Sequence, residues 1–152
     1  MAHTVTLPDG HVISDDRARL DMEFVHDALA GAYWALGRPR ALTERSWAHC
    51  LCFGLYAPDG APAGFARVLT DYTFRAHLAD VFIRPASRGL GLGKAVVDTI
   101  LRHPELATVT HWTLTTSDAQ GLYGRFGFRP SEADSRWMTR TLAQPGAGDA
   151  PA

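Results

Sequence analysis

A glycine-rich turn joins a β-branched segment to an amphipathic segment in the middle of the chain, at Arg88–Lys94. Its three glycines tolerate positive φ and crowd nothing, so several backbone N–H groups can point at one anion. The helix expected behind the turn adds unpaired N–H groups and the positive end of its dipole, and Arg88 and Lys94 add full charges. The natural ligand is a phosphate or diphosphate; the alternative is a strand-to-helix turn that binds nothing.

Two common nucleotide-binding loops have a different spacing. A Walker loop has four residues between its first glycine and Gly-Lys, followed by Ser or Thr. Here Gly93-Lys94 is followed by Ala95, and Arg88 stands at the first glycine position. A dinucleotide loop has the pattern Gly-x-Gly-x-x-Gly, and counting from Gly89 places Lys94 at its last position. The turn therefore belongs to neither type.

A second segment, Ala119–Phe128, has the pattern Ala-x-x-Leu-Tyr-x-x-x-Gly-Phe, with Tyr123 as its tyrosine. The turn itself has the pattern Arg-x-x-Gly-x-Gly and follows the apolar run Val81–Ile83. These two motifs, in this order, resemble those of the GNAT superfamily of acetyl-CoA-dependent N-acetyltransferases. The resemblance covers roughly Leu78–Phe128, and two motifs are more specific than either alone.

The resemblance implies how acetyl-CoA would bind as co-substrate. The turn amides and Arg88 would hold its diphosphate, and the pantetheine arm would pair with the edge of Val81–Ile83 where this strand splays from Thr113–Thr116. A backbone N–H near Val81 or Phe82 would polarise the thioester carbonyl. The residues expected to contact the coenzyme are Val81, Phe82, Ile83, Arg88, Gly89, Leu90, Gly91, Leu92, Gly93, Lys94 and Thr116.

Three residues, Tyr123, His77 and Asp80, are candidates for proton transfer. The resemblance implies that Tyr123 protonates the departing thiolate; the alternative is a tyrosine packed in the core. Thr116 stands where the family often has Asn, seven residues before this tyrosine, and offers one hydroxyl in place of an amide. The base that deprotonates the amine is expected to be His77 or Asp80, although a surface histidine and a paired structural carboxylate are equally good interpretations. Strict alternation turns Asp80 away from Val81 unless a bulge redirects it.

The pocket for the acceptor amine is expected in the first half of the chain. Tyr33, Trp34 and Tyr72 are the candidate substrate-binding residues, because aromatic faces can receive a cation. Arg38 and Arg40 follow the first two in sequence and can clamp a carboxylate. For Trp34 the alternative is ordinary core packing.

The order of elements predicts an α/β (α+β) fold. Its central sheet is expected to be mixed but mostly antiparallel, with about six or seven strands, flanked by helices and, by the resemblance, splayed between its fourth and fifth strands. The expected strands are His11–Ser14, Cys50–Ala57, Ala63–Thr70, His77–Arg84, Val109–Thr116 and Arg136–Thr141. The expected helices are Leu20–Leu29, a short one from Thr43, Leu92–Ile100 and Ala119–Phe126.

Size and composition limit the class of protein. A chain of 152 residues fits one domain, expected at 1–142 with a disordered tail at 143–152. A net charge of −1 argues against a nucleic-acid partner, and no apolar run approaches the ~20 residues that span a membrane. No secretory signal is recognised, so the expected location is the cytoplasm. A homodimer stays open, since dimers are frequent in the family that the chain resembles.

Cysteine and histidine usage gives no sign of a metal. Cys50 and Cys52 are interpreted as two small buried residues, and none of the histidines has metal-ligand spacing. The predicted function is transfer of acetyl from acetyl-CoA to a primary amine of a small molecule or peptide, by direct attack. Two alternatives remain: a non-catalytic acyl-CoA-binding sensor or partner module, and a nucleotide-binding enzyme that uses the same turn.

Overall fold

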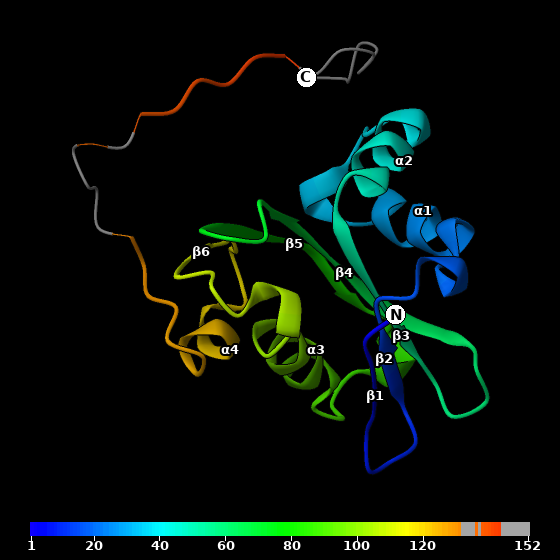
Figure 1. Cartoon of the computed structure of the whole chain (residues 1–152). Coiled ribbons are helices and arrows are strands. Elements are labelled where there is room, and N and C mark those ends of the chain that lie inside the picture. Colours follow the sequence, from blue (N-terminus) through cyan, green and yellow to red (C-terminus); the bar gives the residue numbers. More distant parts are fainter. Residues whose placement is uncertain (132–135, 137, 144–152) are drawn as a thin grey trace.

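The computed structural model describes residues 1–131, 136 and 138–143. Within them, one sheet has six strands in the order β1-β2-β3-β4-β5-β6 (Figure 1). The strands are β1 (Thr4–Thr6), β2 (Val12–Ser14), β3 (Leu51–Tyr56), β4 (Pro62–Thr70), β5 (Arg75–Ile83) and β6 (His111–Thr113). The helices are α1 (Met22–Ala30), α2 (Arg40–Ala48), α3 (Leu92–Leu101) and α4 (Gln120–Gly124), with 3-10 turns η1 (Arg17–Arg19), η2 (Tyr33–Ala35), η3 (Pro85–Ser87) and η4 (Pro104–Leu106). Neighbouring strands are antiparallel except β5 and β6, which are parallel.

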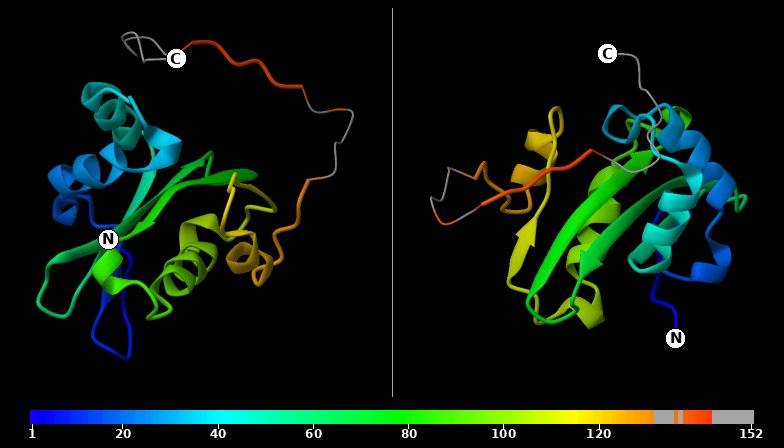
Figure 2. Two further views of the ribbon diagram at one scale, coloured as in Figure 1. Left: turned by 180° about the vertical axis from the view of Figure 1, so that it is seen from behind. Right: turned by 90° about the horizontal axis from the view of Figure 1, so that it is seen from above.

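Helices cover both faces of the sheet. Helices α1 and α2 lie over one face, and α3 and α4 over the other (Figures 1 and 2). Two apolar cores result: one joins Val25 and Trp47 to Phe65 of β4, and the other joins Val96 to Phe53 of β3. Because both faces are covered, β3 is buried at every position, as expected of a central strand.

The sheet forks between β5 and β6. These strands pair over three positions, from Arg75 opposite His111 to His77 opposite Thr113. Strand β5 then continues to Ile83, paired with β4 on its other side. In the described part of the chain, its edge toward β6 therefore has no strand partner beyond His77. We call this separation the fork.

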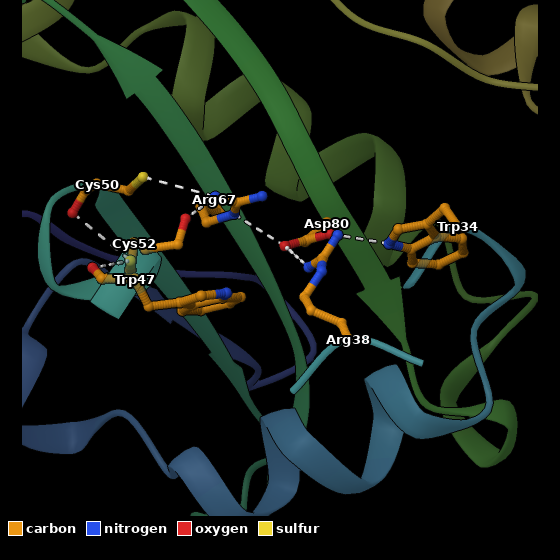
Figure 3. Close-up of polar contacts among 8 residues, drawn as sticks. Trp34, Arg38, Trp47, Cys50, Cys52, Arg67 and Asp80 are labelled. Atoms are coloured by element: carbon orange, nitrogen blue, oxygen red, sulfur yellow. Dashed lines mark hydrogen bonds and ion pairs between the residues drawn. The ribbon is translucent and has the colours of Figure 1, made fainter. Parts of the chain in front are cut away.

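A bulge in β5 lies just beyond the fork. Phe82 pairs with Phe65 and Ala79 with Arg67, so two residues of β5, Asp80 and Val81, lie opposite one residue of β4. Asp80 takes a positive φ of 50°, which is uncommon for a residue other than glycine. A bulge of this kind re-aims a side chain. It turns Asp80 toward Arg67 and Arg38 (Figure 3).

The predicted fold is confirmed: the sheet is mixed and mostly antiparallel, it is open, and helices flank it. The fork lies between the two segments that were predicted to splay, but these are the fifth and sixth strands, because the short strand β1 was not anticipated. The segment predicted as strand Val109–Thr116 pairs only over His111–Thr113.

The prediction of a final strand over Arg136–Thr141 is wrong for the residues that the structure describes. Met138–Thr141 forms no strand, and the Met138 side chain is fully exposed. A strand forms only where a neighbouring strand pairs with it, whatever the β propensity of its residues. Positions 132–135 and 137, and 144–152 of the predicted tail, lie outside the described residues. No helix among the described residues is long and apolar enough to cross a membrane.

Candidate active site

A cavity of about 630 Å³ opens at the fork. Strands β4 and β5 contribute Arg67, Leu69 and His77–Val81 to its wall, the segment after β6 contributes Leu114–Ala119 and Tyr123, and the η2 region contributes Tyr33, Trp34 and Arg38. A second cavity of about 310 Å³ adjoins it, and its lining includes Thr113–Thr116, Tyr123 and Phe128–Ser131. Tyr123 lines both, so the two spaces meet at its ring.

Tyr123 lies on the short helix α4 and is largely buried. Its ring packs edge-on against Phe128, with the centroids 6.0 Å apart. Burial raises the pKa of its phenol, and the nearby charge of Asp118 raises it further. The hydroxyl therefore stays protonated at neutral pH and is able to donate a proton into the cavity.

His77 also lines the larger cavity, and it is the last residue of β5 that pairs with β6. Its Nδ1 is 2.7 Å from Oγ1 of Thr113 on β6. Burial lowers the pKa of the imidazole, and the charge of Arg67 lowers it further. The ring is therefore neutral near pH 7 and able to accept a proton.

Asp80, the other candidate base, accepts three side-chain hydrogen bonds. Its Oδ1 accepts from Nε1 of Trp34 at 2.9 Å, and its Oδ2 accepts from Nη1 of Arg38 at 3.0 Å and Nε of Arg67 at 2.8 Å (Figure 3). Both oxygens of this carboxylate are therefore already bonded to neighbouring side chains. The geometry thus favours His77 over Asp80 as the base.

Sequence reasoning missed Arg67, although a signal was available: it is the single charged residue within the apolar strand β4. The side chain is 10% exposed. Besides Asp80, it donates from Nη1 to the hydroxyl of Ser46 on α2 and lies 3.8 Å from Sγ of Cys50. Arg67 therefore links α2, β4 and β5 beneath the cavity.

The two cysteines are buried, as predicted. The thiol of Cys52 donates to the carbonyl of Trp47 at 3.3 Å, and burial raises its pKa to about 12. A thiol with so high a pKa is inert as a nucleophile. Among the described residues, no group of histidine, cysteine, aspartate and glutamate is placed to hold a metal ion.

The aromatic pair Tyr33 and Trp34 closes one side of the cavity, with ring centroids 5.1 Å apart. The hydroxyl of Tyr33 accepts from Ser117 at 2.8 Å and donates to Asp118 at 3.4 Å, which connects η2 to the segment after β6. Thr116, expected to contact the coenzyme, lines both cavities, and its Oγ1 accepts the Ala119 N–H at 3.0 Å ahead of α4.

Two residues that were considered for the acceptor pocket lie elsewhere. Tyr72 sits in the β4–β5 hairpin with a φ of 61° and lines neither cavity. Arg40 lies at the start of α2 and pairs with Glu23 at 2.6 Å on the surface. Of the predicted substrate-binding residues, the structure therefore brings Tyr33 and Trp34 to the site and leaves Tyr72 out.

The glycine turn leads from β5 through η3 into α3. Gly89 and Gly91 have φ of 81° and 73°, and a Cβ built on either would meet no atom within 4 Å, so this face of the turn is open. The helical ladder begins with the Ala95 N–H bonded to the Gly91 carbonyl, and no side chain caps this end of α3. The N–H groups of Leu92–Lys94 precede the ladder and fit an anion such as a diphosphate.

Arg88 is anchored beside this open face. Its Nε donates to the Ile83 carbonyl at 2.9 Å, and its guanidinium lies 5.6 Å from the centroid of the Phe82 ring. The turn, the unpaired edge of β5 and the cavity at Tyr123 thus follow one another along the same side of the fork.

The family model described as "Acetyltransferase (GNAT) family" matches residues 22–128. The chain belongs to the GNAT family of acetyltransferases. Within it, the chain is 39% identical to a crystal structure from Xanthomonas campestris pv. campestris that is described as belonging to the GNAT family. That match covers 96% of this chain and 95% of the other, with a TM-score of 0.80.

Other members are more distant or match in part. The N-acetyltransferase ycf52 of Pyropia yezoensis is 40% identical over 68 residues, which are 43% of this chain and 38% of that protein. The chain thus matches well under half of this curated relative. The ribosomal-protein-S18-alanine N-acetyltransferase of Escherichia coli shares the GNAT fold at 20% identity, with a TM-score of 0.63 over 87% of this chain and 80% of the other.

Proposed function

We propose that this GNAT protein transfers an acetyl group from acetyl-CoA to a primary amine of a small molecule or peptide, by direct attack of the amine. The observation that carries the proposal is the cavity at the fork. A neutral imidazole, His77, and a protonated phenol, Tyr123, line the same cavity at the fork, where the pairing of β5 with β6 ends. These are the protonation states that amine deprotonation and thiolate protonation require.

The coenzyme would be held by backbone groups for most of its length. The open turn at Gly89 and Gly91, with the first N–H groups of α3, suits the diphosphate. Over Val81–Ile83 the edge of β5 away from β4 has no strand partner, and its Ile83 carbonyl accepts from Nε of Arg88. The other backbone groups of this edge suit the amide groups of the pantetheine arm, which would extend the sheet there. Acetyl-CoA, when bound, supplies the thioester that the amine attacks.

The side chains handle the protons. His77 would take a proton from the acceptor ammonium, directly or through a water, and release it to solvent. The amine nitrogen then forms a bond to the acetyl carbon while the carbon–sulfur bond breaks, and the nitrogen releases its second proton to solvent as the amide forms. Tyr123 would give its proton to the sulfur and regain one from solvent. Asp80 stays paired with its arginines and takes no part in these transfers.

Release of free thiol from acetyl-CoA with a panel of primary amines tests the proposal. We expect Tyr123→Phe to lower kcat by about 100- to 1000-fold, the lower range for general-acid catalysis, and to leave the dissociation constant for the coenzyme unchanged by calorimetry. Tyr56→Phe is the matched control: Tyr56 is also buried, but it lies on β3 and lines neither cavity.

Two results would contradict the proposal. If acetyl-CoA binds but no amine in the panel yields free thiol, the chain is a non-catalytic acyl-CoA-binding module. If only ATP or NAD raises the melting temperature, it is a nucleotide-binding protein. A cytoplasmic location, a homodimer and a single domain over 1–142 stay predictions.

A further inference from the structure

On the acceptor side of the cavity, Arg38, Arg67 and Asp80 form a cluster with more positive than negative charge. Arg38 and Arg67 both donate to the same oxygen of Asp80, so two guanidinium groups share one carboxylate. In the described part of the chain, neither arginine pairs with another acidic residue. A buried charge without a full counter-charge is costly unless a ligand compensates it. This cluster, which we call the arginine pole, therefore has a net charge of +1.

The arginine pole has N–H groups that are not used in side-chain hydrogen bonds, and it is accessible from the cavity. The side chain of Arg38 is 23% exposed, and both arginines line the cavity. A guanidinium has five N–H donors in a planar fork. Arg38 uses only Nη1 in side-chain bonds among the described residues. Its other N–H groups match the two oxygens of a carboxylate, which arginine binds in bidentate geometry.

The arginine pole is close to the proposed base. Arg67 pairs across the strands with Ala79, two residues from His77 on the same strand. Residues two apart on a strand point to the same face, so Arg67 and His77 are diagonal neighbours, at a typical separation of ~7–8 Å. The influence of the Arg67 charge on the His77 pKa reflects this proximity. A group bound at the arginine pole would thus lie within a few bonds of an amine at His77.

The opposite wall carries the other sign of charge. Asp118 lies beyond the Tyr33 ring, bonded to its hydroxyl at 3.4 Å, while the neighbouring Trp34 bonds Asp80. The cavity is therefore positive at Arg38 and negative at Asp118, with two aromatic rings between. A simple cationic amine gains nothing from the arginine pole and is repelled by it.

We propose that the acceptor is a small amine that carries a carboxylate near its nitrogen, as an amino acid does, and that Arg38 binds this carboxylate. The inference rests on the proposed function and narrows its substrate class. One carboxylate brings one negative charge, which cancels the excess at the arginine pole, whereas a phosphomonoester brings about two at neutral pH.

The experiment compares acceptors that differ in the carboxylate alone. Pairs such as phenylalanine and phenethylamine, or alanine and ethylamine, are assayed by free-thiol release, with O-phosphoethanolamine as the phosphate-bearing acceptor. Each acceptor is tested with the wild type and with Arg38→Gln. For each acceptor, the value of kcat/KM in the wild type is divided by the value in Arg38→Gln. The basicity of the amine cancels in this ratio, because both proteins act on the same amine.

We expect Arg38→Gln to lower kcat/KM by about 10- to 100-fold for the carboxylate-bearing member of a pair, as for the loss of a hydrogen bond to a charged group. For the other member the change should stay within about threefold. Arg40→Gln is the matched control, since Arg40 is nearby in sequence but pairs on the surface and lines neither cavity. It should leave both values unchanged.

Equal loss on both members of each pair, or preference for the phosphate-bearing or the carboxylate-free amine, would overturn the inference. If no acceptor is acetylated, the proposed function fails, and calorimetry of amino-acid binding then tests the carboxylate site by itself. Binding of an amino acid that Arg38→Gln abolishes would support the carboxylate site while the proposed reaction fails. If, in that case, no carboxylate-bearing amine binds either, both the carboxylate site and the proposed function are overturned.

Discussion

Nδ1 of His77 lies 2.7 Å from Oγ1 of Thr113, and these two residues are also the last pair that joins β5 to β6. The hydrogen bond therefore crosses the sheet at the point where the fork begins. It holds the imidazole ring in the wall of the cavity and leaves Nε2 as the nitrogen for an acceptor proton.

Thr113 is a positioning residue in this arrangement. Thr113→Val removes the hydroxyl that holds Nδ1, and we expect kcat to fall about 2- to 10-fold, as for the loss of one neutral hydrogen bond. The KM for acetyl-CoA should not change, because the coenzyme sites lie elsewhere. Thr113→Ser keeps a hydroxyl and should restore most of the activity. A kcat that is unchanged in Thr113→Val would show that His77 needs no orientation from β6.

If His77 is the base, kcat/KM should depend on pH in a particular way. Burial and Arg67 lower its pKa below the usual value near 6.5, so the neutral base persists to lower pH than for a free histidine. The ratio of kcat/KM between the wild type and His77→Gln should stay constant above pH 6.5 and decline only below it. A ratio that does not vary between pH 5 and 8 would exclude His77 as the base.

The same pKa shift affects stability. Because the folded state holds this proton less tightly than the unfolded chain, the free energy of unfolding falls as the pH drops below 6.5. His77→Gln removes this contribution, so the difference in stability between pH 7.5 and 5.5 should be smaller in the variant. Urea denaturation at the two pH values measures it, and an identical difference in both proteins would contradict the shift.

Asp80 is predicted to be structural. Asp80→Asn leaves Arg38 and Arg67 without their carboxylate, and we expect a loss of about 3 kcal/mol, as for the broken half of a buried ion pair. In a chain of this size this corresponds to a melting temperature lower by roughly 6–12 °C. Asp98→Asn is the control, because its pair with Arg102 on α3 is exposed and worth less than about 1 kcal/mol. A variant that keeps its melting temperature but loses the acid limb of its pH profile would instead make Asp80 the base.

The glycine turn is predicted to bind through its backbone. Gly91→Ala puts a methyl group on a residue at φ 73°, which costs about 1–2 kcal/mol, and the methyl group faces the space proposed for the diphosphate. We expect affinity for coenzyme A to fall about tenfold or more, as hydrogen bonds to a charged group are lost. Gly60→Ala, in the β3–β4 hairpin at φ 88°, carries the same strain without a ligand. Equal coenzyme affinity in both variants would refute the proposed site.

Most of the fold followed from local patterns. The amphipathic spacing of α3 and the short apolar runs of β3 to β5 were recognised within a few residues of their observed bounds, because burial against neighbouring layers selects apolar residues at those positions. The three-residue strand β1 was not anticipated, since so short a strand has no period to detect. The segment 136–141 has the composition of a strand, but pairing depends on a neighbour that its own residues cannot specify.

The candidate site divides in the same way. The sequence by itself determined the glycine turn and the Tyr123 segment, because each is a run of neighbouring residues whose geometry is local. Only the tertiary structure revealed the partners of Asp80 and His77. The partners of Asp80 stand 46, 42 and 13 residues away at Trp34, Arg38 and Arg67, and Thr113 stands 36 residues from His77. Whether a carboxylate or an imidazole is free to move a proton depends on which groups surround it in space, and the bulge and the fork bring those groups together.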